Sequence, residues 1–211
     1  KKGFDYDALA LESSATGSNA RMSLDDRALV ISGVEHFVVS DSQQVVVYPD
    51  KARGSQVTVG QNRSIHFDGR IEAGKFVFFV ENCDFSYEDF RFEMPSIHKL
   101  YFAVENFNNP DSLHPVMTPL SNLVGSLRVD LPDNHCGLTD NKDFPIFESR
   151  ENSYVFYDQK NIRGGQYKKD KFYYTLHPFV LNDLVNFIPD SLQFNGVLTS
   201  AGIFPDLTYP L

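Results

Sequence analysis

The sequence predicts an all-β fold, an elongated array of short strands that is β-solenoid-like or built of stacked sheets, with a two-sheet β-sandwich as the alternative. One phrase recurs at 67–76 (FDGRIEAGKF) and 194–204 (FNGVLTSAGIF), and both copies contain Phe, an acid or its amide, Gly and Ala-Gly-x-Phe. Aromatic residues make up 14% of the 211 residues and include 19 Phe, which is enough to fill a core. Short apolar runs separated by Gly, Pro and Asn complete the pattern of a strand-rich chain.

The clearest strand is expected over 64–73 (SIHFDGRIEA). Apolar residues or glycine occupy every odd position from 65 to 73, and polar or charged residues occupy every even position. This period of two is typical of a strand with one buried and one solvated face. The run at 192–199 repeats the alternation, with Val197 as the one apolar residue on the polar side.

The remaining elements follow from short apolar runs and the turn residues between them. Strands are expected at 28–31, 37–40, 44–48, 56–59, 75–80, 90–94, 100–105, 123–129, 153–157 and 172–176. The run at 75–80 (KFVFFV) is apolar on both sides, so we expect this strand in the interior. Helix is expected only over 6–12 and 181–187, both short.

Three prolines between 106 and 122 predict a loop or linker. We therefore expect an N-terminal strand-rich repeat unit at 1–110 and a C-terminal strand-rich repeat unit at 111–211.

Charge and cysteine content exclude several classes of function. The chain has 28 acids against 19 bases and no basic stripe, so nucleic acid is not an expected partner. No apolar run approaches the roughly 18 residues of a membrane-spanning helix, so no transmembrane segment is expected in this stretch. Cys83 and Cys136 lack metal-ligand spacing; they form either one disulfide or two reduced, partly buried thiols, and we favour the second.

No catalytic residue, cofactor site or metal site is predicted. The six histidines form no metal-binding pair, and we expect His66 to be solvated on the polar side of its strand. His135 adjoins Cys136, but neighbouring residues in a turn rarely direct a nucleophile and a base at one substrate. Ser96 and Lys99 match a Ser-x-x-Lys pattern, yet the residues that follow are strand-like.

Carboxylates cluster at 84–89 and again at 130–143. The second cluster offers oxygen ligands for calcium but lacks the spacing of an EF-hand, and we favour a solvated acidic loop.

Tyrosines are the candidate ligand platforms, because an aromatic ring with a hydroxyl can stack on and hydrogen-bond a sugar. The alternative is that tyrosines at strand spacing are half-buried packing residues, and the absence of Trp favours this alternative. The candidates are Tyr101, Tyr154, Tyr157, Tyr167, Tyr173 and Tyr174.

Several turn and packing phrases resemble a known family. They are VVSDS at 38–42, VYP at 47–49, NR at 62–63, FDG at 67–69, AGKF at 73–76, PIFE at 145–148, GG at 164–165 and SAGIFP at 200–205. Together they are similar to a segment of long, uncharacterised envelope-associated proteins of the Bacteroidota, over about 28–205. The resemblance implies that the chain is a piece of a longer protein and that its setting is extracytoplasmic, in the periplasm or at the cell surface. It implies no catalytic residue.

The expected function is a non-enzymatic structural or interaction module of a large cell-envelope or surface protein. Its expected partners are other segments of the same long chain or other envelope proteins. A carbohydrate-binding or carbohydrate-cleaving β domain is the alternative, with a glycan as partner.

Overall fold

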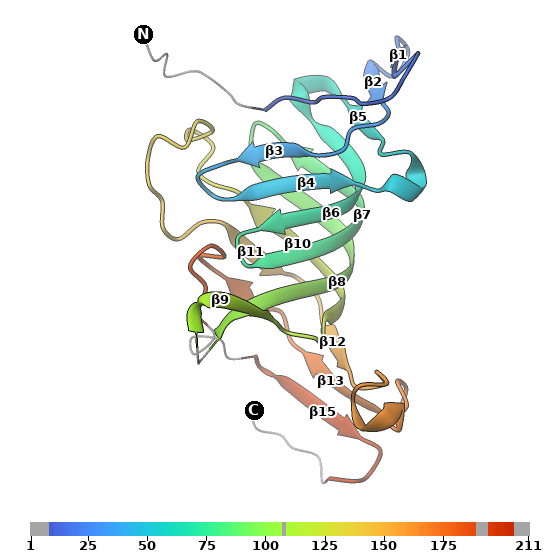
Figure 1. Ribbon diagram of the computed structural model, residues 1–211, viewed down its shortest axis with the longest axis vertical. Helices are drawn as coiled ribbons and strands as arrows, with labels where there is room; N and C mark the ends of the chain where they lie inside the picture. The colour runs from blue at the N-terminus through green and yellow to red at the C-terminus, as the bar shows by residue number, and fades with distance from the viewer. Residues whose placement is uncertain (1–8, 107–108, 189–193, 205–211) are drawn as a thin grey trace.

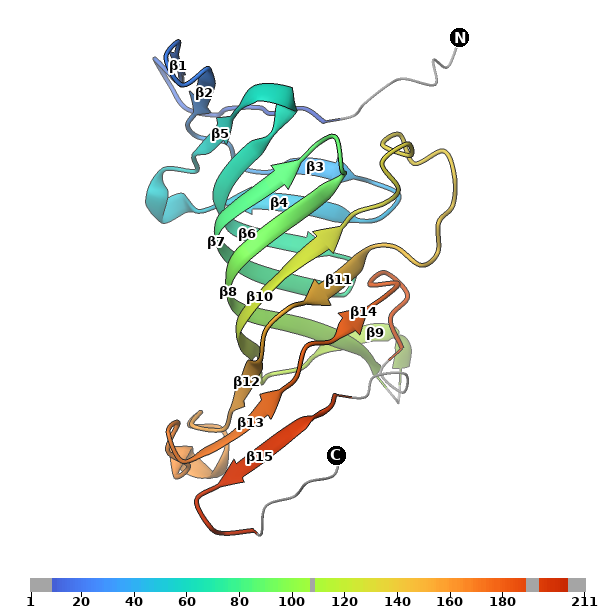
Figure 2. The ribbon, with the colours of Figure 1, turned by 180° about the vertical axis from the view of Figure 1, so that it is seen from behind.

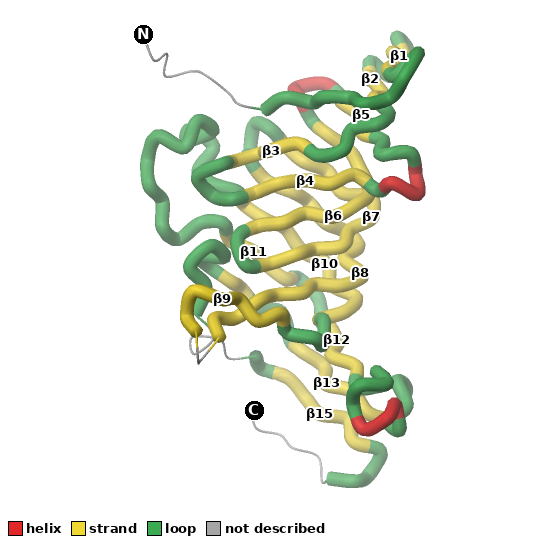
Figure 3. Tube along the Cα trace, viewed as in Figure 1, coloured by secondary structure: helices red, strands yellow, loops and turns green. Residues whose placement is uncertain are grey.

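The computed structural model describes residues 9–106, 109–188 and 194–204, and these residues form strands, turns and three short 3-10 helices. The prediction of an all-β fold is confirmed, and Figure 3 shows how strands dominate. The strands are β1 (Ala20–Ser23), β2 (Ala28–Ile31), β3 (Phe37–Ser40), β4 (Val45–Pro49), β5 (Val57–Val59), β6 (Ile65–Ala73), β7 (Phe76–Ser86), β8 (Arg91–Asn106), β9 (Asn109–Pro115), β10 (Leu120–Arg128), β11 (Ile146–Ser149), β12 (Ser153–Phe156), β13 (Phe172–Leu176), β14 (Val180–Leu181) and β15 (Gly196–Ser200). The 3-10 helices are η1 (Lys51–Arg53), η2 (Gln61–Arg63) and η3 (Arg163–Gly165). Within the described ranges, no helix is long and apolar enough to cross a membrane.

The strands pair antiparallel in the order β1-β2-β5-β6-β7-β8-β10-β12-β13-β15. Long strands change partner along their length: β6 pairs first with β5 and then with β4, and β8 pairs first with β10 and then with β9. The sheet therefore divides and folds over itself. Figures 1 and 2 show β3 and β4 on one side of the interior and β10 and β11 on the other. This arrangement is a stacked one, in which the same strands contribute to both layers.

The bend coincides with irregular pairing in neighbouring strands. The register shifts between Phe67 and Gly69 in β6, between Phe79 and Val80 in β7, and between Leu123 and Gly125 in β10. Asn82 adopts a left-handed backbone conformation with φ 54°. Bulges increase local twist and bend the strand, so a row of them allows a wide sheet to fold over one core.

The core is largely phenylalanine. Phe67, Phe76, Phe78, Phe85 and Phe92 are almost completely buried and belong to one hydrophobic cluster. Neighbouring rings meet edge to face or tilted, as between Phe67 and Phe92 at 6.1 Å and 85°. Such contacts add to the free energy gained by burying the rings.

The alternation predicted for 64–73 is confirmed, because Ile65, Phe67, Ile71 and Ala73 are buried and His66 is exposed. The prediction that 75–80 is buried on both faces is wrong. Phe76 and its alternate neighbours face the core, but Phe79 on the other face is 39% exposed. A continuous apolar run does not distinguish a strand covered on both faces from one that displays an aromatic ring to solvent.

Other predictions are also corrected. The segment 106–122, expected as a loop, contains β9 and the start of β10. The helix expected at 181–187 is the end of β14 followed by a turn. Of the helix expected at 6–12, residues 6–8 lie outside the described residues and 9–12 are not helical. The expected boundary near residue 110 falls inside β9, and the sheet continues across it through the pairing of β10 with β8.

The last strands of the sheet extend beyond the folded part (Figures 1 and 2). We call β12, β13 and β15 the aromatic ribbon. In β15 an added Cβ on Gly196 would collide with the carbonyl oxygen of Thr175, and in β6 one on Gly69 would collide with that of Tyr48. In both copies of the repeated phrase, glycine therefore permits close approach of a neighbouring strand.

Candidate functional site

A groove of about 660 Å³, lined by both apolar and charged residues, lies over the solvent face of β4, β6, β7 and β8. We call it the β6–β8 groove. Its size is within the usual range of ligand sites, roughly 300 to 1,000 Å³. The lining residues are Glu35, His36, Tyr48, Pro49, Asp50, Lys51, Asp68, Gly69, Arg70, Phe79, Val80, Glu81 and His98.

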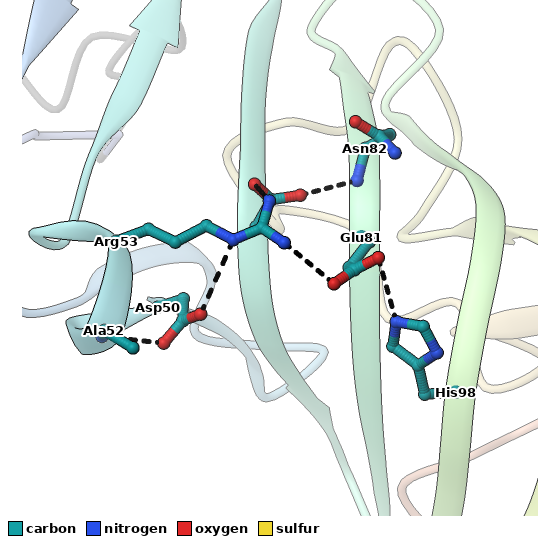
Figure 4. Close-up of polar contacts among 7 residues, drawn as sticks. Asp50, Ala52, Arg53, Glu81, Asn82 and His98 are labelled. Carbon is teal, nitrogen blue, oxygen red and sulfur yellow. Dashed lines mark hydrogen bonds and ion pairs between the residues drawn. The ribbon is translucent and has the colours of Figure 1, made fainter.

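Arg53 organises one side of the groove, as Figure 4 shows. The guanidinium extends from η1 and forms an ion pair with Asp68 on β6. Its second terminal nitrogen lies 2.8 Å from Oε1 of Glu81 on β7. Hydrogen bonding to Asp68 and its negative charge raise the pKa of Arg53, so this residue is a permanent cation.

Each oxygen of the Asp68 and Glu81 carboxylates has one partner in this network and keeps capacity to accept a second hydrogen bond. The second oxygen of Asp68 accepts a 2.7 Å hydrogen bond from the backbone N–H of Asn82, the left-handed residue of the bulge. The second oxygen of Glu81 lies 3.1 Å from Nε2 of His98 on β8 (Figure 4). The network therefore joins η1, β6, β7 and β8, and it fixes the orientation of each polar group.

Aromatic rings border the other side of the groove. The guanidinium carbon of Arg70 lies 4.3 Å from the ring centroid of Tyr48, and His36 stacks on the same tyrosine at 5.8 Å. Phe79 contacts Tyr101 edge to face at 5.9 Å and 76°. Tyr101 is thus the one predicted tyrosine whose ring contacts a residue of the groove.

The other predicted tyrosines belong to the aromatic ribbon or to the loop beside it. Tyr154 stacks on Phe156 at 5.8 Å and meets Tyr173 edge to face at 6.0 Å. Tyr167 stacks on Phe172 at 4.4 Å. These rings pack against other aromatic rings.

Tyr157 and Tyr174 are on the inner side of the ribbon. They line an apolar groove of about 320 Å³ together with Phe102, Val116, Thr118, Leu120, Val155, Leu176 and Phe194. Tyr174 is 8% exposed, and its hydroxyl donates a hydrogen bond to the carbonyl oxygen of Phe194 at 3.2 Å. Burial raises the pKa of Tyr157.

The remaining sequence candidates have structural partners. His66 is exposed and its Nδ1 lies 2.8 Å from Oδ1 of Asp84, so the expected solvated histidine is confirmed. Nε2 of His135 lies 2.7 Å from the carbonyl oxygen of Tyr87, and its ring stacks on that residue, so it is not directed at Cys136.

Cys83 is buried and Cys136 is exposed, and no disulfide joins them. Two separate thiols were therefore predicted correctly, but Cys136 is not partly buried.

The acidic cluster at 130–143 contains a buried clamp. Asp130, 2% exposed, accepts hydrogen bonds from the side-chain amides of Gln43 at 3.0 Å, Asn134 at 2.9 Å and Asn141 at 2.6 Å. The backbone N–H of Leu131 donates a fourth at 2.7 Å. The expectation of a solvated acidic loop is therefore wrong for this residue. Throughout the described ranges, no three His, Cys, Asp or Glu side chains are placed to hold a metal ion.

Sequence reasoning did not identify the β6–β8 groove. Its residues come from five separate segments, and only the register between β6, β7 and β8 brings Asp68, Glu81 and His98 together. The available signal was weak: charged residues at alternate positions of neighbouring strands. Arg53 is in a turn and carries no local pattern.

Comparison with known proteins gives no match: no family model, no curated protein and no solved structure is similar to this chain.

Proposed function

We propose that the chain is a non-enzymatic structural or interaction module of a large cell-envelope or surface protein, and that it contacts other β segments through the outer edge of β15. These segments belong to the same long chain or to another envelope protein. The observation that carries the proposal is that β15 is the last strand of the sheet and, among the described residues, pairs only with β13.

The composition of this edge supports strand addition. Natural edge strands usually carry charges or proline, which prevent pairing with a second chain. β15 (GVLTS) has neither, and Val197 is 42% exposed. Ile203 and Phe204, just beyond the strand, are 59% and 50% exposed. An uncharged, partly apolar edge of this kind is suited to accept another strand by main-chain hydrogen bonding.

The groove favours binding rather than bond cleavage. None of its lining residues is a serine, threonine or cysteine. Asp68 and Glu81 are both engaged by Arg53 in ion pairs.

Site-specific photo-crosslinking in the native host tests the proposal. A photoreactive amino acid at Val197 should give cross-links to β segments of the same protein or of an envelope protein, identified by mass spectrometry. The control position is Leu138, an exposed apolar residue in a loop. A Val197→Lys change should reduce strand addition, because a charged edge disfavours pairing. Equal cross-linking from both positions would contradict the proposal, as would turnover of glycosides that disappears in Glu81→Gln.

Carbohydrate binding is the second candidate function. It is favoured by one observation, the partly exposed Phe79 among the fixed carboxylates and guanidinium groups of the groove.

A further inference from the structure

We propose that the β6–β8 groove binds a neutral sugar unit of a glycan, with Phe79 as the stacking platform. The inference names the site and ligand class for the second candidate function, and it does not depend on strand addition at β15. The proposed platform is therefore not one of the six predicted tyrosines. It is a phenylalanine on the solvent face of β7, a strand that the sequence predicted to be buried on both faces.

Phe79 is the aromatic residue of β7 that lines the groove. Phe79 is 39% exposed in the middle of β7, on the face of the strand that lies away from the core. Charged residues lie near it on this face: Glu81 follows two residues later on β7, and Lys99 is its register partner on β8. Tyr101 contacts the ring edge to face and restricts its movement. Ligand sites are usually lined by apolar and aromatic side chains with a few precisely placed polar groups, and the β6–β8 groove has both kinds of lining residue.

The polar groups around this ring suit hydroxyl groups. Arg53 lies between Asp68 and Glu81, and the second oxygen of Glu81 approaches His98. Carboxylates accept hydrogen bonds and guanidinium or imidazole groups donate them, so both kinds of partner lie side by side. A sugar hydroxyl both donates and accepts, and adjacent hydroxyls on one ring can use such an alternating set.

The charge balance argues against an ionic ligand. Four acidic residues (Glu35, Asp50, Asp68 and Glu81) and three basic residues (Lys51, Arg53 and Arg70) lie in and beside the groove. The carboxylates would repel an anion and the guanidinium groups would repel a cation, and such repulsion between like charges opposes binding. A neutral polar ligand encounters neither repulsion.

The geometry also explains why the tyrosines of the aromatic ribbon are weaker platforms. Tyr154 and Tyr173 pack against each other and against Phe156, and Lys169 lies 4.3 Å from the Phe156 ring centroid. Neither Tyr154 nor Tyr173 lines the β6–β8 groove or the apolar groove.

The experiment is a screen of neutral and acidic oligosaccharides on an array, followed by saturation-transfer-difference NMR with the best ligand. Three purified proteins are compared: wild type, Phe79→Thr and Tyr154→Thr. Threonine keeps strand propensity, and both positions are on the solvent face of a strand, so the pair is matched. Circular dichroism and thermal unfolding establish that each variant is folded.

The expected result is binding of a neutral oligosaccharide that weakens at least tenfold in Phe79→Thr and less than twofold in Tyr154→Thr. Three results would overturn the inference: a wild-type protein that binds no neutral glycan at millimolar concentration, preferential binding of acidic glycans or of peptides, or loss of binding in Tyr154→Thr alone. None of these results affects cross-linking at Val197, so failure of the groove and failure of the interaction module are distinguishable.

Discussion

Replacement of Asp130 by asparagine tests a buried side chain that accepts four hydrogen bonds. Oδ2 accepts from Gln43 and Asn134, and Oδ1 accepts from Asn141 and Leu131. Asparagine has the same shape but replaces one acceptor oxygen by a donor NH₂ group. In either orientation of the amide, the new NH₂ group would face two of the four N–H donors that Asp130 accepts from in the wild type.

The expected loss of stability follows from the number and exposure of these donors. A buried donor without a partner costs about 1–3 kcal/mol. The new amide should turn its NH₂ toward the Oδ1 side, where the donors are only partly buried and water can reach them. We therefore expect Asp130→Asn to lower the free energy of unfolding by about 2–3 kcal/mol, near the low end for two donors.

Urea unfolding of wild type, Asp130→Asn and the control Asp133→Asn measures this effect. Asp133 is exposed in the same loop, and its change should alter stability by less than about 0.5 kcal/mol. Excess calcium should leave the wild-type midpoint unchanged, because N–H donors occupy both oxygens of Asp130. A loss below about 0.5 kcal/mol in Asp130→Asn, or a marked stabilisation by calcium, would refute the interpretation of the cluster as a hydrogen-bonded clamp.

Three further predictions concern packing and titration. Gly69→Ala should destabilise the protein by at least about 2 kcal/mol, because the new methyl group meets a backbone carbonyl of β4. Gly17→Ala has open space around it and should cost only about 1 kcal/mol of backbone strain. Equal losses in thermal unfolding would contradict the close approach of β4 to Gly69. Burial raises the pKa of the Cys83 thiol well above its usual value, so Ellman's reagent at pH 8 should react quickly with the exposed Cys136 and with Cys83 only after unfolding; two fast thiols in the native protein would be inconsistent with this structure. Burial also raises the pKa of Tyr157, so this phenol ionises at a lower pH in the unfolded chain than in the folded protein. The stability that the neutral phenol contributes is therefore constant below about pH 10 and is lost as the pH rises further. In urea unfolding between pH 9 and pH 11, Tyr157→Phe should lose less stability than wild type, and an identical pH dependence would count against this.

Local pattern was sufficient to predict most strands but not their pairing. The alternation over 64–73 reflects one covered and one solvated face, so the sequence alone identifies which residues of β6 face the core. The run at 75–80 contains the same apolar residues on both faces, and its sequence does not reveal that Phe79 faces solvent. β9 was missed because prolines at 110 and 115 suggested a loop, although an edge strand tolerates proline.

The candidate site depends on contacts between distant parts of the chain. Asp68, Glu81 and His98 are neighbours only because β6, β7 and β8 pair in a register that bulges shift by single residues. Arg53 reaches them from a turn, where no periodicity exists. The tyrosines were easier to notice because they are concentrated in the sequence, but in the structure most of them pack against other rings.

The most direct test of the interaction module is hydrogen exchange along β15, compared between this chain alone and the larger protein proposed to contain it. The N–H of His177 bonds to the carbonyl oxygen of Asn195, and bonded and non-bonded pairs alternate along an antiparallel ladder. The amides of Gly196 and Leu198 therefore point away from β13, whereas those of Val197 and Thr199 point toward it. We predict that Gly196 and Leu198 exchange quickly in the isolated chain and become protected in the larger protein, and unchanged exchange at both positions would contradict the account.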